Sequence, residues 1–235
     1  MQQPAFSARR LWRSATILIS GCVSWMAALA ADITPYLQTP TASSIWVSWK
    51  TAEGDESVVE YGLDGGPLNR SASGSTQALA SNYRLHGVQL TGLQPETLYA
   101  YRVRTGTQVS PIYRFRTQPT AARKTGHFRI LVTGDHQLRN DDRHTPLLQA
   151  AKKKIESLTG QPLEESVHLM LNNGDQVDVG TLDHYEFVHM KPSSVVSGNL
   201  AIMTALGNHE TYYDPGLANW RAHYFYDQTS YKGIP

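Results

Sequence analysis

Three segments of the chain end in a glycine that is followed by a possible metal ligand. The pairs are Gly134-Asp135, Gly174-Asp175 and Gly207-Asn208, and each follows a short apolar run. Carboxylate and amide oxygens bind hard cations, and two cations joined by one carboxylate can activate a water and neutralise phosphoryl oxygens. A single Gly-Asp pair carries little information because such pairs are common in turns. Three of them, each closing an apolar run, favour one shared metal site.

The apolar runs before these pairs predict buried strands at residues 128–133, 167–171 and 200–206. Helical patterns separate the runs, which favours a sheet covered by helices. Open α/β sheets bind their ligands beyond the carboxyl ends of the strands. We therefore expect Asp135, Asp175 and Asn208 to converge at one edge of the sheet.

Three helices are predicted between and after these strands. The first runs from Thr145, a possible cap, to Gly160, and its apolar stripe consists of Leu148, Ala151, Ile155 and Leu158. The second covers residues 182–190. Its His184 and His189 lie five positions apart and so off one face, which favours surface or core-edge histidines. The third covers residues 217–226 and contributes Trp220, Tyr224 and Phe225 to the core.

The segment before residue 118 has an all-β pattern. Alternating or apolar runs predict strands at 44–49, 58–61, 86–90, 99–104 and 113–117, with turns at Gly54, Gly65-Gly66, Gly92 and Gly106. Leu93-Gln-Pro-Glu-Thr-Leu-Tyr99 has the pattern of a tyrosine corner. The segment resembles a fibronectin type III domain with Trp49 in its core. We expect a β-sandwich domain at 32–118, a polar linker, and an α/β domain at 127–235.

The first 30 residues have the features of an export signal. Arg9, Arg10 and Arg13 precede an apolar stretch that ends in Ala28-Leu29-Ala30, a small-residue cleavage site. We expect a periplasmic or secreted protein with no membrane-spanning segment after cleavage. A second interpretation is a lipoprotein anchored at Cys22, the single cysteine, and Arg9-Arg10 also hints at twin-arginine export. Without the three leader arginines, 18 basic residues remain against 20 acidic ones, a net charge of −2, so nucleic-acid binding is not expected.

The three glycine pairs, together with Gly207-Asn208-His209-Glu210, resemble the calcineurin-like metallophosphoesterase superfamily. With the sandwich domain in front, the arrangement is similar to purple acid phosphatases. The resemblance implies that Asp135 binds a first metal ion, that Asp175 bridges two ions and that Asn208 binds the second. It also implies that His209 contacts the phosphoryl group and helps the leaving oxygen to depart.

Three positions depart from the family pattern. Gln137 stands where His or Gly is usual, so either Gln137 is a weak ligand or a local shift makes His136 the ligand. Asp178 replaces the tyrosine that gives purple enzymes their colour, which leaves Fe, Zn, Mn and Mg open as metals. The family's later histidines are missing: only His223 follows His209. We therefore expect this chain to be the front part of a longer enzyme and to be inactive alone.

The resulting functional hypothesis is hydrolysis of small-molecule phosphate esters by a metal-activated water, as in an acid phosphomonoesterase. A phosphodiesterase or nucleotidase of the same superfamily is one alternative. A secreted, non-catalytic fibronectin-like interaction protein is the other. The sequence leaves the oligomeric state open.

Overall fold

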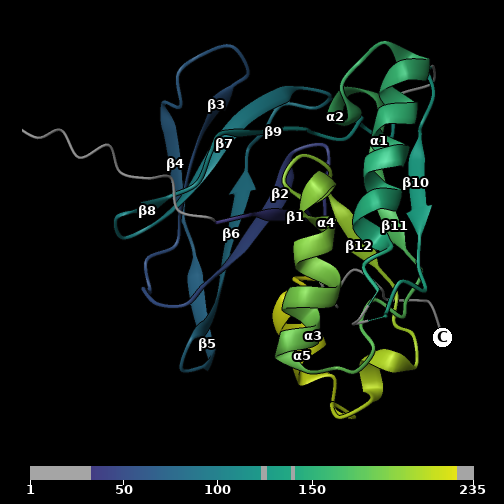
Figure 1. Cartoon of the computed structure of the whole chain (residues 1–235). Coiled ribbons are helices and arrows are strands. Elements are labelled where there is room, and N and C mark those ends of the chain that lie inside the picture. Colours follow the sequence, from purple (N-terminus) through teal and green to yellow (C-terminus); the bar gives the residue numbers. More distant parts are fainter. Residues whose placement is uncertain (1–32, 123–125, 139–140, 227–235) are drawn as a thin grey trace, which may run out of the picture.

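The computed structural model describes residues 33–122, 126–138 and 141–226. Figure 1 shows a strand-rich sandwich followed by a mixed region of strands and helices. The predicted signal peptide and Cys22 lie outside the described residues. Within those residues, every helix is too short or too polar to cross a bilayer.

The sandwich consists of two antiparallel sheets. One has the order β1-β2-β6-β5, and the other has the order β4-β3-β7-β8 with β9 also paired to β7. The strands are β1 Tyr36–Gln38, β2 Ser44–Thr51, β3 Val58–Leu63, β4 Arg70–Ser73, β5 Ser75–Ala80, β6 Tyr83–Thr91, β7 Leu98–Thr105, β8 Gln108–Val109 and β9 Tyr113–Arg116. The five predicted strands are all present, whereas β1, β4, β5 and β8 were not predicted.

Trp49 and the tyrosine corner organise the core of the sandwich. Trp49 is fully buried, and its indole N–H donates to Thr105 Oγ1 at 2.9 Å. The Tyr99 hydroxyl accepts a hydrogen bond from the backbone N–H of Gln94 at 3.0 Å. This bond to the chain just upstream is the contact expected of a tyrosine corner.

The second region is built on three parallel strands in the order β10-β11-β12, which are Ile130–Thr133, Leu169–Asn172 and Ile202–Thr204. Helices α1 (His144–Thr159) and α2 (Leu163–Ser166) connect β10 to β11. A continuous helix connects β11 to β12, formed by α3 (Leu182–His184), the π-helical turn η1 (Tyr185–Met190) and α4 (Lys191–Ser197). Right-handed crossovers between consecutive strands place both connections on the same face, and α1 and α4 lie side by side in Figure 1.

The two faces of this sheet differ in burial. Met170 and Ile202 pack under the helices with Leu148 and Val196. On the opposite face Ile130, Val132 and Leu171 are 43%, 62% and 37% exposed. The prediction of buried strands is therefore wrong for this face, because both crossover helices cover the other one.

Several helix predictions need correction. Thr145 is not a cap: it lies inside α1, and its backbone N–H donates to Asp142 Oδ1 at 2.9 Å. Leu158 is 71% exposed and does not belong to the buried stripe. The second helix extends to Ser197, seven residues beyond its predicted end. The third, α5, spans Ala218–His223, because the backbone of Tyr224 is already extended.

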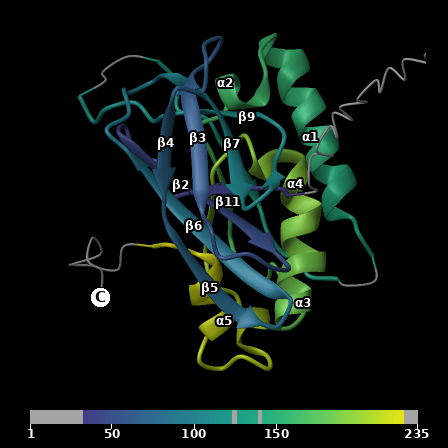
Figure 2. The same cartoon turned by 90° about the vertical axis from the view of Figure 1, so that its left-hand side faces the viewer.

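The two regions share a close interface at the end of α5. Phe225 stacks on Trp46 of β2 with ring centroids 4.4 Å apart, and a Cβ added at Gly87 would collide with this ring. The carbonyl oxygen of His223 accepts hydrogen bonds from the Tyr36 hydroxyl and from Gln38 Nε2, both at 2.9 Å. Figure 2 shows α5 beside β5 and β6, where Ala222 packs against Tyr83 and Leu85.

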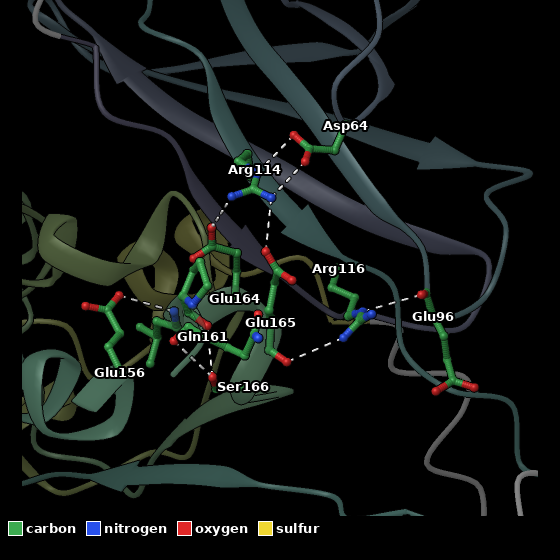
Figure 3. A network of polar contacts seen from close by, with 11 residues as sticks. Asp64, Glu96, Arg114, Arg116, Glu156, Gln161, Glu164, Glu165 and Ser166 are labelled. Atoms are coloured by element: carbon green, nitrogen blue, oxygen red, sulfur yellow. Dashed lines mark hydrogen bonds and ion pairs between the residues drawn. The ribbon is translucent and has the colours of Figure 1, made fainter. Parts of the chain in front are cut away.

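A second set of contacts joins the regions through Arg114 of β9. Figure 3 shows its guanidinium between Asp64 of the sandwich and Glu164 and Glu165 of α2. The nitrogen–oxygen distances are 2.7, 3.3 and 3.1 Å, respectively. Hydrogen bonding to Asp64 and the neighbouring carboxylates raise the pKa of Arg114 above its ordinary value.

Candidate metal centre

The carboxyl ends of β10, β11 and β12 meet at one edge of the sheet, as the sequence predicted. The backbone N–H of Asp135 donates to the carbonyl oxygen of Gly174 at 3.2 Å, which joins the first two loops. The backbone N–H of His209 donates to Asp175 Oδ1 at 3.1 Å, which joins the second loop to the third. The three predicted ligands Asp135, Asp175 and Asn208 therefore follow adjacent strands in adjacent loops.

Both aspartates adopt a left-handed backbone conformation, with φ of 53° at Asp135 and 50° at Asp175. This region is unfavourable for most residues, least so for Asn and Asp, and such strain gathers at functional sites. The glycines act mainly by allowing close approach. A Cβ at Gly207 would overlap the Asp175 carboxylate, and a Cβ at Gly174, whose φ is 105°, would lie 2.7 Å from the nitrogen of Gly207.

Glu210 holds the second and third loops together, a role that the sequence analysis did not assign. Its carboxylate is fully buried. It accepts backbone hydrogen bonds from Gln176 at 2.6 Å, Gly207 at 2.6 Å and Asp175 at 3.1 Å. A buried carboxylate with three N–H donors is a strong local brace, so Glu210 sets the position of the backbone that carries Asp175.

His209 is held in place by Asp178. Its Nδ1 lies 2.8 Å from the carbonyl oxygen of Asp178, so we assign the proton to Nδ1 and the free lone pair to Nε2. The Asp178 carboxylate lies 3.7 Å from the same nitrogen. The Asn208 side chain donates through Nδ2 to the Tyr212 hydroxyl at 2.7 Å, which leaves its Oδ1 available as an oxygen ligand.

Gln137 and His136 differ in their surroundings. The Gln137 Oε1 atom is buried and has no hydrogen-bond partner within the described part of the chain, so it is an acceptor without a donor. The His136 ring instead stacks on His144, with centroids 3.6 Å apart and an interplanar angle of 5°. The His136 ring thus belongs to a histidine cluster.

The sequence predicted surface or core-edge positions for His184 and His189, and the surface alternative is wrong. His184 and His189 are 4% and 1% exposed, so neither lies at the surface. α-Helical spacing does not apply to Tyr185–Met190, because these residues form a π-helical turn that alters the direction of His189. No signal in the sequence announces such a turn.

The donor set at this edge suits hard cations. Asp135, Gln137, Asp175 and Asn208 offer oxygen atoms, and the buried, unpartnered oxygen of Gln137 supports an ion at this position. His223 does not extend the set, because its ring nitrogens contact the Tyr83 hydroxyl at 2.9 Å and the Asn219 carbonyl oxygen at 2.7 Å. These residues suit a metal ion, but they provide few ligands for a centre with two metal ions.

Both regions of the chain match the sequence models of known protein families. Residues 31–117 match the sequence model of the purple acid phosphatase N-terminal domain, and residues 128–234 match that of the calcineurin-like phosphoesterases. The chain thus combines a domain of the purple acid phosphatase N-terminal type with a domain of the calcineurin-like phosphoesterase type. It is 31% identical over 118 residues to purple acid phosphatase 15 of Arabidopsis thaliana, covering 39% of this chain and 22% of that protein.

Two further comparisons show how much of such proteins this chain matches. Acid phosphatase type 7 of Danio rerio is 38% identical over 80 residues, which cover 31% of this chain and 18% of that protein. The purple acid phosphatase PPD1 of Lupinus luteus has the same fold, with a TM-score of 0.56, 20% identity and coverage of 75% of this chain and 35% of that one. The chain therefore spans about a fifth of the length of the curated relatives that it matches.

Proposed function

We propose that this chain carries the first half of the metal centre of a phosphoesterase that hydrolyses small-molecule phosphate esters. The observation that carries the proposal is the junction of three loops, in which Asp135 bonds to Gly174 and Asp175 bonds to His209. This junction supports a shared position for the three proposed ligands at one edge of the parallel sheet. The family match supports the reaction class.

Each site residue has a proposed role. Asp135, Asp175 and Asn208 would hold two metal ions, and Gln137 would contribute its otherwise unpartnered oxygen. When bound, the ions supply an activated water and neutralise phosphoryl charge. His209 turns Nε2 toward the departing oxygen, because its Nδ1–H is bonded to the Asp178 carbonyl. In its doubly protonated form it donates the Nε2 proton to that oxygen and returns to the neutral Nδ1–H tautomer. Glu210 positions the backbone of Asp175.

We also propose that residues 1–235 alone bind these ions weakly and have little or no turnover. The described residues supply mainly oxygen ligands at this edge, and His223 is engaged elsewhere. The division into domains at 32–118 and 127–235, the fibronectin type III character of the first domain and export to the periplasm or medium remain part of the proposal. Replacement of the family tyrosine by Asp178 leaves the identity of the metals open.

The test compares this chain with a product of the same gene extended by any reading frame beyond Pro235. Hydrolysis of p-nitrophenyl phosphate is measured with Mn²⁺, Zn²⁺ or Fe²⁺. We expect turnover only in a longer product that supplies further histidines, and its loss in Asp175→Asn. Turnover that survives Asp175→Asn would contradict the assigned centre, and the absence of turnover in every product would favour a non-catalytic interaction protein. Bis-p-nitrophenyl phosphate, used in parallel, separates phosphomonoesterase from phosphodiesterase activity.

A further inference from the structure

Three histidine rings from three separate segments form a cluster next to the carboxylate centre. His136 follows Asp135, His144 is the first residue of α1, and His189 lies in η1. One ring nitrogen from each residue lies within 4.8 Å of the others. His136 Nε2 and His189 Nδ1 are 3.0 Å apart, and the His136 and His144 rings are stacked.

Two nitrogens of this cluster are buried without a partner. His144 and His189 are 2% and 1% exposed. Neither His144 Nδ1 nor His189 Nε2 has a hydrogen-bond partner among the residues that the structure describes. Buried polar atoms are almost always paired, and each exception requires an explanation. Two exceptions in one group of imidazoles point to a missing ligand.

The contacts of His144 leave one nitrogen free for that ligand. Its Nε2 lies 3.2 Å from the Ser193 hydroxyl of α4, so we assign Nε2–H as the donor to Ser193. The lone pair then lies on Nδ1, the unpartnered atom. Histidines that bind metals usually donate their other N–H to a second group, which fixes the tautomer and the ring orientation. Ser193 fits that positioning role.

The protonation state of the cluster also suits a metal. Burial lowers the pKa of His144 to about 4 and that of His189 well below its ordinary value. These two rings are therefore neutral at pH 7, the form that binds metals. The Asp142 carboxylate, which raises the pKa of His144, supplies a nearby negative charge.

The π-helical turn gives an independent indication. The helix between β11 and β12 departs from α-helical hydrogen bonding only at Tyr185–Met190. Such turns are rare and occur often at functional sites. Here the turn carries His189 into contact with His136, which connects this helix to the loop after β10.

We propose that His136, His144 and His189 bind one divalent transition metal ion, most suitably Zn²⁺, at a site separate from the oxygen ligands Asp135, Asp175 and Asn208. Zn–N bonds of about 2.0–2.1 Å in a tetrahedral site separate nitrogens by about 3.3 Å, and one ring nitrogen from each of the three histidines already lies within 4.8 Å of the others. The His144 ring tilts out of its stack on binding, because lone pairs lie in the ring plane. The ion ties the loop after β10 to α1 and η1.

The test is titration of the metal-stripped chain with Zn²⁺ alone by calorimetry, with circular dichroism to check the fold. We expect one equivalent to bind and to raise the midpoint of thermal unfolding. The equivalent should be lost in His144→Gln and His189→Gln, and it should persist in His127→Gln, an exposed control. Ser193→Ala should retain the fold and bind about tenfold more weakly, as expected when an outer partner of a ligand is removed.

Asp175→Asn separates this proposal from the proposed phosphoesterase centre, because it removes the bridging carboxylate and leaves all three histidines in place. The Zn²⁺ equivalent should survive in this variant. Its loss would assign the ion to the carboxylate centre and overturn the separate site. Absence of Zn²⁺ binding, or unchanged binding in both His144→Gln and Ser193→Ala, would also overturn it.

Discussion

Replacement of Glu210 by glutamine tests whether this buried carboxylate holds the metal-binding loops together. Glutamine has nearly the same shape, so the change removes charge and one acceptor without opening a cavity. Its single oxygen can still face the N–H groups of Asp175 and Gly207, which share Oε2 at 3.1 and 2.6 Å. The amide nitrogen then faces the N–H of Gln176, which now donates to Oε1 at 2.6 Å.

The expected cost follows from these three bonds. Hydrogen bonds to charged groups contribute about 1.5–3 kcal/mol each, and neutral ones about 1 kcal/mol. Glu210→Gln loses one charged bond and weakens two, while it relieves part of the cost of burying a carboxylate. We expect the free energy of unfolding to fall by about 2–4 kcal/mol.

Urea unfolding measures this change as a lower midpoint at an unchanged slope. Glu186→Gln is the matched control, because it breaks the 2.9 Å ion pair between Lys50 and Glu186. The two side chains are 29% and 28% exposed, respectively. Partly exposed pairs contribute about 0–1 kcal/mol. If Glu210→Gln costs no more than Glu186→Gln, the brace assigned to Glu210 does not exist.

Three further predictions concern the metal-binding loops and the acid sensitivity of the fold. Asp175→Asn should retain the fold, since Asn tolerates the φ of 50°, and should weaken Mn²⁺ binding in calorimetry at least tenfold, by about 1.4 kcal/mol; unchanged affinity would remove Asp175 from the site. Gly207→Ala should reduce Mn²⁺ binding because its Cβ overlaps the Asp175 carboxylate, whereas Gly216→Ala, which faces open space, should bind normally. Burial lowers the pKa of His86 and His223 from 6.5 to about 4. Below pH 6.5 the unfolded state therefore binds more protons than the folded state. Each histidine should then lower the free energy of unfolding by about 1.4 kcal/mol per pH unit down to pH 4. Urea midpoints at pH 7 and pH 5 measure this loss, and His86→Gln should flatten it; an equal slope in that variant would be a contrary result.

The arrangement of strands and ligands could be predicted because it depends on local patterns. A short apolar run, a glycine and an oxygen ligand recur three times, and parallel strands bring their carboxyl ends together without further information. The roles of Trp49 and Tyr99 could be predicted for the same reason, since alternation and a Leu-x-Pro-x-Thr pattern identify them within a few residues.

What could not be predicted depends on tertiary contacts. Glu210 looks like an ordinary acidic residue until the second loop supplies two N–H groups to its buried carboxylate. His189 was assigned by α-helical spacing, which the π-helical turn invalidates. β4 and β5 are rich in Ser and Ala and largely exposed, so they lack the apolar alternation that identifies a strand.

The contact of Phe225 with Trp46 has a consequence for how the chain behaves when it is cut. The ring stacks at 4.4 Å over Gly87, and the His223 carbonyl oxygen nearby receives two hydrogen bonds from the first region. These contacts use residues at opposite ends of the described chain and do not involve the connecting segment 119–126. A protease cut in that segment should therefore leave two fragments that co-elute as one complex, and only a denaturant would part them.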